Sequence, residues 1–561
     1  MTKKTKSGLI LLLILLGLVA INLLSGVVFQ RFDFTKDQRY TLSETTHSLI
    51  EEVNEPMFVE VFLEGNFPGE IRKLQTETQQ ILEEFSAINP EIYFAFTNPH
   101  EQPNTDQFLA QLHANGMKPL SVTVNNKGKK SQEMAFPWAV LTYGENQTIV
   151  PLMRNLMSVS LDENINSSVQ YLEYAFAEAM QKVTLPKTKK IAIIKGIDAP
   201  NDMFFADLLI TLRERYFIAP YTLDSIPSNP NKTLQDLKEY DLAMIIKPNK
   251  TFSEEAVQVL DQYIMSGGKT VWMLDQVQAE MDSLMQNNEI ITYPKQTGLD
   301  EMFFRYGVRI NPVLVQDEMG TPIRLAVGRQ GSETVYDNFI WKFAPFALSS
   351  NSHPIVKNLE GVKLDFVSQI DTLKNDIQKT VLLQSSPYSS TIGSPQAISL
   401  QMLNDEVDAQ FYQDKGNYPL AVLLEGEFTS TYNNRVLPFN QTDFANQSIP
   451  TKMIVIADGD IARNQLDERK MPLELGFDKW TNTLYGNKEF MLNSVNYLMD
   501  DSGLMSLRNK TVQLPLLDKE KVYQNYSKIQ VLVVGLPLLA VSVFAAFFMI
   551  WRRKKYQKKI S

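Results

Sequence analysis

The chain has 561 residues, a formal net charge of −10 and no cysteine, with 44% apolar and 21% charged residues. This length predicts three or more structural units, and this composition is typical of folded rather than disordered protein. Nucleic-acid binding depends on cations that neutralise phosphates, so we expect no nucleic-acid partner for so acidic a chain. The absence of cysteine excludes disulfides, thiol nucleophiles and cysteine-based zinc sites.

The charge is uneven along the chain. Residues 1–29 carry three lysines and residues 529–561 carry six cations, and neither end carries an acid. Between these two ends, 45 basic residues face 64 acidic residues. The ends are therefore positive, and the long middle part is strongly negative.

Each basic end flanks a long uncharged apolar run, Gly8–Phe29 with 22 residues and Ile529–Trp551 with 23 residues. A helix of about 22 residues is roughly 33 Å long, enough to cross a hydrocarbon core of about 30 Å. The first run is longer than the apolar part of a signal peptide and lacks a small-residue cleavage site, so we interpret it as an uncleaved anchor. The positive-inside rule places both termini in the cytoplasm.

These features predict a two-pass protein of the inner (cytoplasmic) membrane with a large periplasmic body and the lipid bilayer as a partner. The predicted parts, in chain order, are a cytoplasmic tail 1–7, a transmembrane helix 8–29, a juxtamembrane segment 30–55, an α/β domain 56–185, a second α/β domain 186–500, a return segment 501–528, a transmembrane helix 529–551 and a basic cytoplasmic tail 552–561.

The first α/β domain follows a helix that we expect to begin at the N-cap Ser43. Apolar periodicity predicts its elements in this order: a strand at Met57–Leu63, a helix at Gly69–Ala87, a strand at Ile92–Phe96, a helix at 104–115, strands at Ser121–Asn125, Trp138–Tyr143 and Gln147–Leu152, and a long helix that begins with a Ser160–Glu163 capping box. The order predicts a thioredoxin-like layout. Because no CxxC is present, we expect a scaffold without redox chemistry.

The second α/β domain alternates buried strands with helices, which predicts a doubly wound parallel sheet. The expected elements are strands at Lys190–Lys195, Leu242–Lys247, Lys269–Leu274 and Lys452–Ala457, and helices at 202–216, 254–266 with Ser253 as N-cap, and 488–499 with Asn487 as cap. Residues 277–450 form a predicted β-rich insertion that holds buried strands at Val381–Gln384 and Pro419–Leu424.

The segment Ser266–Thr270, Ser-Gly-Gly-Lys-Thr, resembles the end of a phosphate-binding loop. That loop needs a glycine at position 263, where this chain has tyrosine, and it runs from a strand into a helix rather than the reverse. We therefore interpret the glycines as a helix C-cap. The four histidines fit neither a metalloprotease nor a serine-hydrolase motif, and we predict no catalytic residue, no metal site and no cofactor.

Three aspartates follow predicted strands. Asp458 and Asp460 come directly after Lys452–Ala457, and Asp275 follows Lys269–Leu274. Ligand sites in α/β folds lie at the carboxyl ends of parallel strands, so these three are candidate ligand-binding residues of one crevice. Ordinary turn chemistry and a solvated acid are the alternatives.

Small residues in the second apolar run are candidates for docking on a partner helix, because they allow close approach. The candidate residues are Gly535, Pro537, Ala540, Ser542 and Ala545. Pro537 leaves a carbonyl near position 533 without its helical partner, and we expect a bend there.

An ordered set of motifs resembles the gliding-motility-associated ABC transporter substrate-binding proteins of Bacteroidota, the G components of the Gld system. The motifs are Arg31–Ser43, Phe136–Trp138, His353–Ile355, Leu382–Ser386, Leu424–Phe428, Ala457–Asp460 and Gly486–Phe490. The resemblance implies an external α/β domain shared with an intraflagellar transport protein. It also implies partnership with an ABC permease subunit and, through it, a cytoplasmic ATPase. The chain departs from ordinary solute-binding proteins in having two apolar runs and no cysteine for a lipid anchor.

Two functional interpretations follow. The first is a non-catalytic, membrane-anchored periplasmic accessory subunit, of the substrate-binding type, in an ABC transporter complex that supports gliding motility. The second is a periplasmic ligand-binding or hydrolytic domain that acts on envelope glycan or another solute. The second predicts acids with raised pKa values that converge on a pocket, whereas the first predicts a crevice without them and apolar surface near the membrane.

Overall fold

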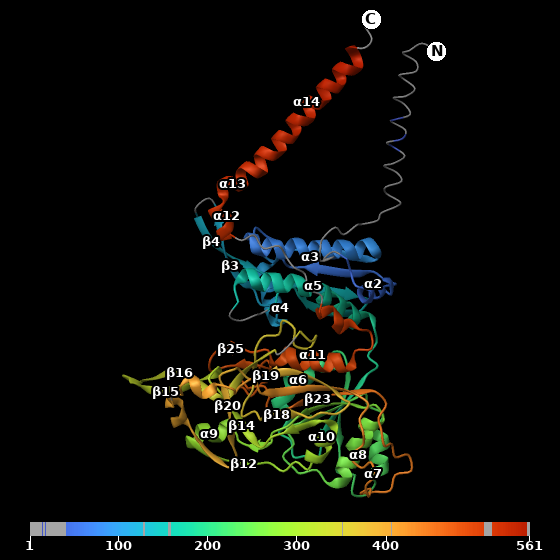
Figure 1. Ribbon diagram of the computed structural model, residues 1–561, viewed down its shortest axis with the longest axis vertical. Coiled ribbons are helices and arrows are strands. Elements are labelled where there is room, and N and C mark those ends of the chain that lie inside the picture. Colours follow the sequence, from blue (N-terminus) through green and yellow to red (C-terminus); the bar gives the residue numbers. More distant parts are fainter. Residues whose placement is uncertain are drawn as a thin grey trace. The chain divides into compact units, whose positions relative to one another are not determined.

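Figure 1 shows the computed structural model, which describes residues 41–126, 129–154, 159–349, 352–405, 407–509 and 519–557, with Ile14, Gly17 and Val19 as isolated positions. The described residues from 41 to 509 belong to one compact unit, and those from 519 to 557 belong to a second. The predicted helix at Gly8–Phe29 lies outside the described residues except for those three positions. Its membrane-spanning role stays a prediction.

The first part of the body is built on a four-stranded sheet with the order β2-β1-β5-β6, in which β1 is parallel to β2 and antiparallel to β5. Its elements are α2 (Glu44–Glu51), β1 (Met57–Val61), α3 (Gly69–Ile88), β2 (Ile92–Phe96), α4 (Thr105–Ala114), β3 (Leu120–Asn126), β4 (Lys129–Ala135), β5 (Trp138–Tyr143), β6 (Asn146–Pro151) and α5 (Leu161–Thr184). The strand β4, which pairs only with β3, was not predicted, because its sequence is mostly polar.

Helices α3 and α5 pack against each other and run side by side in Figure 1. Strand β1 alternates buried and exposed residues, and its buried residues Met57, Val59 and Val61 share one core with both helices. Burying each such side chain contributes about 1.5–3 kcal/mol. The predicted caps are confirmed: Ser43 accepts a hydrogen bond from the amide of Thr46, and the Ser160–Glu163 capping box forms in full.

The second part of the body is built on a ten-stranded sheet, which confirms the predicted α/β class. Its parallel strands are β7 (Lys190–Lys195), β8 (Phe217–Thr222), β9 (Leu242–Ile246), β10 (Lys269–Met273) and β23 (Thr451–Ile456). The helices that accompany them are α6 (Ala206–Arg213), α7 (Pro230–Leu237), α8 (Glu254–Met265) and α11 (Asn487–Met499). Numbered along the chain, these strands lie in the order 2-1-3-4-5, a common order of doubly wound sheets.

The sequence prediction missed β8 and α7. Strand β8 lies at the edge of the sheet, contains Pro220 and lacks the apolar run of the central strands. Helix α7 has only eight residues, too few for a clear helical period. The glycine cap at the end of α8 is confirmed, since Gly267 has a φ of +92° and the Gly268 amide donates to the carbonyl of Tyr263.

The predicted β-rich insertion contributes strands to the same sheet. Beyond β23 the sheet continues through the antiparallel strands β22 (Pro419–Gly426), β19 (Gln378–Gln384), β16 (Glu333–Ser349) and β15 (Gly320–Gln330). The remaining elements are β11 (Val277–Gln278), α9 (Met281–Asn287), β12 (Glu289–Pro294), α10 (Asp300–Tyr306), β13 (Val308–Ile310), β14 (Val313–Asp317), β17 (Val362–Lys363), β18 (Ile370–Thr372), β20 (Ser389–Gly393), β21 (Gln396–Ser399), β24 (Phe477–Asp478) and β25 (Thr483–Leu484). The residue limits of the predicted domains stay predictions.

A buried ion cluster joins the two parts of the body. Glu489, in the first turn of α11, accepts hydrogen bonds from Arg154 at 2.7 Å and from Arg508 at 2.9 Å. Arg154 follows β6, and Arg508 lies in a 3-10 turn, Leu504–Asn509. The Arg508 side chain is only 1% exposed, and its Nε donates to the carbonyl of Pro354. One carboxylate therefore links the small-sheet part, the large-sheet part and the chain that follows them.

The second unit contains one long helical stretch. It comprises α13 (Tyr526–Gln530), a π-helical turn (Val531–Gly535) and α14 (Leu536–Gln557), preceded by α12 (Lys519–Gln524). Among the described residues, Tyr526–Lys555 is long and apolar enough to cross a membrane, with a mean hydropathy of 2.6 over an 18-residue window. The π-helical turn ends two residues before Pro537 and includes position 533, whose carbonyl the sequence predicted to lack its helical partner. The predicted bend stays a prediction.

The Glu489 cluster generates a stability prediction. Burial alone would raise the pKa of Glu489, but Arg154 and Arg508 outweigh burial and hold it below its ordinary value. We expect Glu489→Gln to lower the free energy of unfolding by about 2 kcal/mol at pH 7, below the 3–5 kcal/mol typical of a fully buried pair because the carboxylate is 34% exposed. A group with a lowered pKa stabilises the fold above that pKa, so the difference from wild type should shrink as pH falls below 4.5.

Thermal and denaturant unfolding of the full chain in detergent would measure this difference. The exposed Glu468 provides the control, and Glu468→Gln should change the stability by no more than about 0.5 kcal/mol. A Glu489→Gln protein as stable as wild type at pH 7 would show that the cluster contributes nothing.

Candidate functional site

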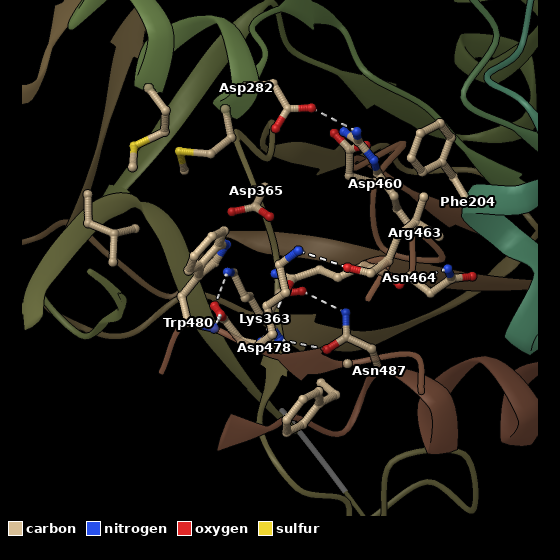
Figure 2. A pocket seen from close by; sticks show the side chains of 18 of the residues that line it. Phe204, Asp282, Lys363, Asp365, Asp460, Arg463, Asn464, Asp478, Trp480 and Asn487 are labelled. Atoms are coloured by element: carbon tan, nitrogen blue, oxygen red, sulfur yellow. Dashed lines mark hydrogen bonds and ion pairs between the residues drawn. The ribbon is translucent and has the colours of Figure 1, made fainter. Parts of the chain in front are cut away.

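A cavity of about 780 Å³ opens beside the carboxyl end of β23. Its wall combines Lys363 and Asp365 from the segment around β17, residues 458–466 that follow β23, and residues 476–480 around β24. Figure 2 shows these polar side chains pointing toward one another around the hollow. The volume lies in the range of small-molecule sites, about 300–1,000 Å³. The position is the one that parallel α/β sheets use for ligands.

Lys247 lies behind the cavity, at the point where β9 ends. Its side chain is 2% exposed, and its Nζ lies 2.6 Å from Asp460, 2.9 Å from Glu280 and 3.6 Å from Asp275. The residue has a left-handed φ of +41°, a strained conformation for a lysine. Burial by itself would lower the pKa of Lys247, but the three carboxylates raise it above its ordinary value. The ammonium group therefore stays charged inside the protein.

The three acids around Lys247 have the composition of a metal site. Oxygens of Asp275, Glu280 and Asp460 all lie within 4.8 Å of one another. The Lys247 ammonium, however, lies within 3.6 Å of all three carboxylates. A buried cation of this chain thus already neutralises the trio, and we interpret it as a lysine-centred ion cluster.

The structure brings the three predicted ligand-binding residues together. The backbone amide of Gly459 donates to Asp275 Oδ1 at 2.6 Å, and that of Asp460 donates to Asp458 Oδ1 at 2.6 Å. Asp458 and Asp460 line the cavity, whereas Asp275 does not. Gly459 is needed between them, because a Cβ there would lie 2.7 Å from Lys247 Cγ and 2.9 Å from the Asp275 oxygens.

Several acids of this site hold protons more tightly than usual. Burial is the main cause that raises the pKa of Asp458, and the carboxylates of Asp460, Asp275 and Asp365 raise it further. Burial likewise raises the pKa values of Asp275 and Asp365, against the opposing effects of Lys247 and Lys363. Acids with raised pKa values therefore converge on the cavity, as the second functional interpretation predicted.

Other site residues were not found from the sequence. Arg463 lies 2.9 Å from Asp282 and 3.6 Å from Asp460, with its guanidinium 4.9 Å from the centre of the Phe204 ring. Lys363 and Asp478 form an ion pair at 3.0 Å. Lys247 could have been found, since it follows a buried strand as Asp275 does. Lys363 and Asp478 end the two-residue strands β17 and β24, and Asp365 follows β17; strands this short carry no sequence signal of their position.

The prediction that Asn487 caps α11 is wrong. Gly486 occupies the N-cap position and makes no side-chain cap, whereas Asn487 is the first residue of the helix. The Asn487 side chain instead accepts from the amide of Lys363 and donates to the carbonyls of Lys363 and Ile461. It thereby attaches two segments of the cavity wall to α11 instead of capping the helix.

The five predicted docking residues lie in the long apolar helix but not on one face. Gly535 ends the π-helical turn, and Pro537, Ala540, Ser542 and Ala545 lie in α14. At 3.6 residues per turn, Gly535 and Ser542 are two turns apart on the same face, with Ala545 adjoining and Pro537 and Ala540 on the opposite side. The Ser542 hydroxyl donates to the carbonyl of Leu538 within the helix.

The Lys247 cluster generates the next prediction. We expect Lys247→Met to cost about 3–5 kcal/mol of unfolding free energy at pH 8, because three carboxylates lose their buried cation. Burial already raises the pKa of Asp275 and Lys247 opposes this, so without that cation the pKa of Asp275 should rise further. A group with a raised pKa stabilises the fold at low pH and loses this effect as pH rises. The deficit should therefore be smaller at pH 5 than at pH 8, as measured by denaturant unfolding.

The exposed Lys374 provides a matched control, and Lys374→Met should leave stability within about 0.5 kcal/mol of wild type at both pH values. An equal deficit for Lys247→Met at pH 5 and pH 8 would contradict the ion cluster.

Comparison with known proteins adds the family context. An uncharacterized protein of Borreliella burgdorferi is 20% identical over 420 residues, which cover 72% of this chain and 74% of that protein. Among solved structures, the mmIFT52 N-terminal domain is 14% identical with a TM-score of 0.32, covering 56% of this chain and 99% of that one. A ThuA-like protein from Parabacteroides merdae is 12% identical with a TM-score of 0.27, covering 59% and 94%. Scores this low carry no argument about function.

Two families match parts of the sequence. A domain of unknown function matches residues 36–142, which include the first strands of the small sheet. Residues 188–494, more than half of the chain, match a second family, and this range contains every parallel strand of the large sheet and the whole cavity wall. The chain therefore belongs to the family described as an ABC-type uncharacterized transport system, a family of ABC-transporter auxiliary proteins.

Proposed function

We propose that the chain is a membrane-anchored, non-catalytic accessory subunit of an ABC transporter, with a body that offers a solute-binding cavity. The family match carries this proposal, because it covers the part of the chain that forms the cavity. The apolar helix Tyr526–Lys555 supports attachment to the membrane. The basic residues that follow Trp551 would contact anionic lipid, each contributing about 1 kcal/mol.

The proposed topology is two-pass in the inner membrane, with both termini cytoplasmic and the body periplasmic. The cation clusters beside both apolar runs support it, by the positive-inside rule. The proposed fold of the first part of the body is thioredoxin-like, supported by a sheet in which β1 is parallel to β2 and antiparallel to β5. As no CxxC is present, this part would act as a scaffold.

The proposed partners are an ABC permease subunit and, through it, a cytoplasmic ATPase. The chain itself has no complete phosphate-binding loop, and Lys269 begins the central strand β10, at the amino ends of the parallel strands, whereas the cavity opens at their carboxyl ends. Energy would therefore come from another chain. The more specific proposal, support of gliding motility, rests on the resemblance of motifs such as Ala457–Asp460 and Gly486–Phe490 to the Gld proteins.

A second candidate function, hydrolysis of envelope glycan or another solute, is favoured by the acids with raised pKa values at the cavity. A hydrolase needs an acid and a base that are both free to reach the substrate. Asp458, however, is 0% exposed and accepts two backbone amide hydrogen bonds, and Asp460 is bound to Lys247. We therefore propose binding of a solute rather than its hydrolysis.

The topology can be tested with an epitope tag at the C-terminus. In intact spheroplasts the tag should resist added protease while the body is digested, and detergent permeabilisation should expose it. A periplasmic reporter protein serves as the control for accessibility. Digestion of the tag in intact spheroplasts would overturn the proposed topology.

The accessory role can be tested by co-purification in mild detergent. The wild-type chain should retain a permease and an ATPase, identified by mass spectrometry. Replacing Ile529–Trp551 with an uncharged polyleucine span should preserve membrane insertion, because the span stays long and apolar. It should also preserve the unfolding temperature of the body, whose sequence is unchanged. It should abolish co-purification and movement, since Gly535, Ser542 and Ala545 no longer permit close helix approach.

A control variant keeps the native helix and exchanges Pro537 and Ala540, on the opposite face, for leucine; it should still co-purify. If no ABC component accompanies the wild-type chain, the accessory role is wrong. If the polyleucine protein co-purifies normally, the contact surface lies in the body instead.

A further inference from the structure

The inner wall of the cavity holds more acids than cations. Seven carboxyl groups lie in one connected cluster: Asp275, Glu280, Asp282, Asp365, Asp458, Asp460 and Asp478. Four cations of the chain face them: Lys247, Lys295, Lys363 and Arg463. Arg324 and Lys479 line the exposed rim of the cavity. With these two included, the cavity wall and the cluster behind it contain seven acids and six cations.

The cations are already paired. Lys247 is held by Asp460 and Glu280, Arg463 by Asp282, and Lys363 by Asp478. At the rim, Arg324 donates to the carbonyl of Trp480 and Lys479 to that of Leu466. A phosphate or carboxylate ligand would have to compete with acids of the chain for Lys247, Arg463 and Lys363, and with backbone carbonyls for Arg324 and Lys479. The site is thus poorly suited to an anion.

Asp365 has no counter-ion in contact among the described residues. Its Oδ1 atom is buried without a hydrogen-bond partner among the described residues, and in Figure 2 its carboxylate lies in the cavity with no dashed line to a neighbour. The Asp365 backbone amide donates to Asp458 Oδ2 at 2.9 Å, which fixes the residue in the wall. A buried carboxylate without a partner either takes up a proton or pairs with a donor from outside the chain.

The cavity also offers apolar surface. Trp480, whose side chain is 60% exposed, lines it together with Phe477, Met281 and Met285. Its volume of about 780 Å³ exceeds what an inorganic ion needs and suits an organic molecule. A ligand that fits this wall has a positive donor group and an apolar portion.

We propose that the cavity binds an organic cation, a molecule in which a primary ammonium group pairs with the Asp365 carboxylate while its apolar portion lies against Trp480. This inference rests on the proposed function, since it names the class of solute that the accessory subunit would bind. The ammonium would add a positive charge to a site in which carboxyl groups outnumber cations. It needs no metal ion and no cofactor.

Binding of a cation would depend on pH. The charged groups that act on Asp365 are Lys363, Lys247, Asp460, Asp478 and Asp458, and the Asp365 backbone amide donates to Asp458. Burial raises the pKa of Asp365, and a protonated carboxyl group binds an ammonium weakly. The ammonium itself stays charged below about pH 10. The affinity should therefore increase as pH rises through the pKa of Asp365.

Calorimetric titration of the full chain in detergent with 2-phenylethylamine and its neutral counterpart 2-phenylethanol would test this inference. We expect the amine to bind at least tenfold more tightly than the alcohol at pH 8, and less tightly at pH 5.5. Asp365→Asn should weaken amine binding tenfold or more and leave alcohol binding unchanged, while Asp365→Glu should restore part of the affinity. The exposed Asp236 provides the control variant Asp236→Asn, which should bind as wild type does.

Three outcomes would each overturn the inference: equal binding of amine and alcohol, an amine affinity that Asp365→Asn leaves intact, or no amine binding up to about 10 mM. A dissociation constant of about 1 mM corresponds to −4.1 kcal/mol, so this limit covers even weak binding. Tighter binding of inorganic phosphate would do the same. The unfolding temperature of each variant shows whether it is folded. Because Asp365→Asn should still co-purify with the transporter, failure of the ligand class and failure of the accessory role give different results.

Discussion

The arrangement of the site depends on one buried ammonium group. Lys247 ends a central parallel strand, and Asp275, Glu280 and Asp460 reach it from three different segments. A lysine buried alone would lose its proton, and three buried carboxylates alone would take protons up. Together they hold the ends of β9, β10 and β23 and the start of the insertion in one geometry, which the left-handed backbone of Lys247 and the glycine at 459 accommodate.

The cavity wall is built outward from this cluster. Asp460 contacts both Lys247 and Arg463, Asp458 fixes the backbone of Asp365, and Asn487 ties the segment of Lys363 to α11. The same helix carries Glu489, two residues further on, which holds Arg154 and Arg508. The first turn of α11 thus contacts the cavity, the small-sheet part of the body and the segment that precedes the second unit. An accessory subunit that responds to a bound solute would need such connected elements.

Much of the fold could be predicted because apolar runs and helix caps within short segments determine where these strands and helices form. The buried parallel strands β7, β9, β10 and β23 appear as short apolar runs, and Ser43, Ser160 and Ser253 cap their helices as their sequences predict. Strand β4, strand β8 and helix α7 were missed because none of them has a clear period of apolar residues. Strand β4 is a polar hairpin strand, β8 is an edge strand that contains proline, and α7 has only two turns. Asn487 was misassigned because a polar residue at a helix start resembles a cap, whereas its side chain contacts residues more than 25 positions away.

The sequence by itself determined the α/β class, the apolar C-terminal helix and the position of Asp275, Asp458 and Asp460 after parallel strands, because these depend on residue order within short segments. Only the tertiary structure decided that Asp275 lies behind the cavity and that Lys247 neutralises the acid trio. It also decided that Asp365 faces the hollow with an Oδ1 atom that has no hydrogen-bond partner among the described residues. These facts depend on which distant segments meet at the end of the sheet. Whether a carboxylate is paired, and hence what it can bind, is set by those neighbours and not by the local sequence.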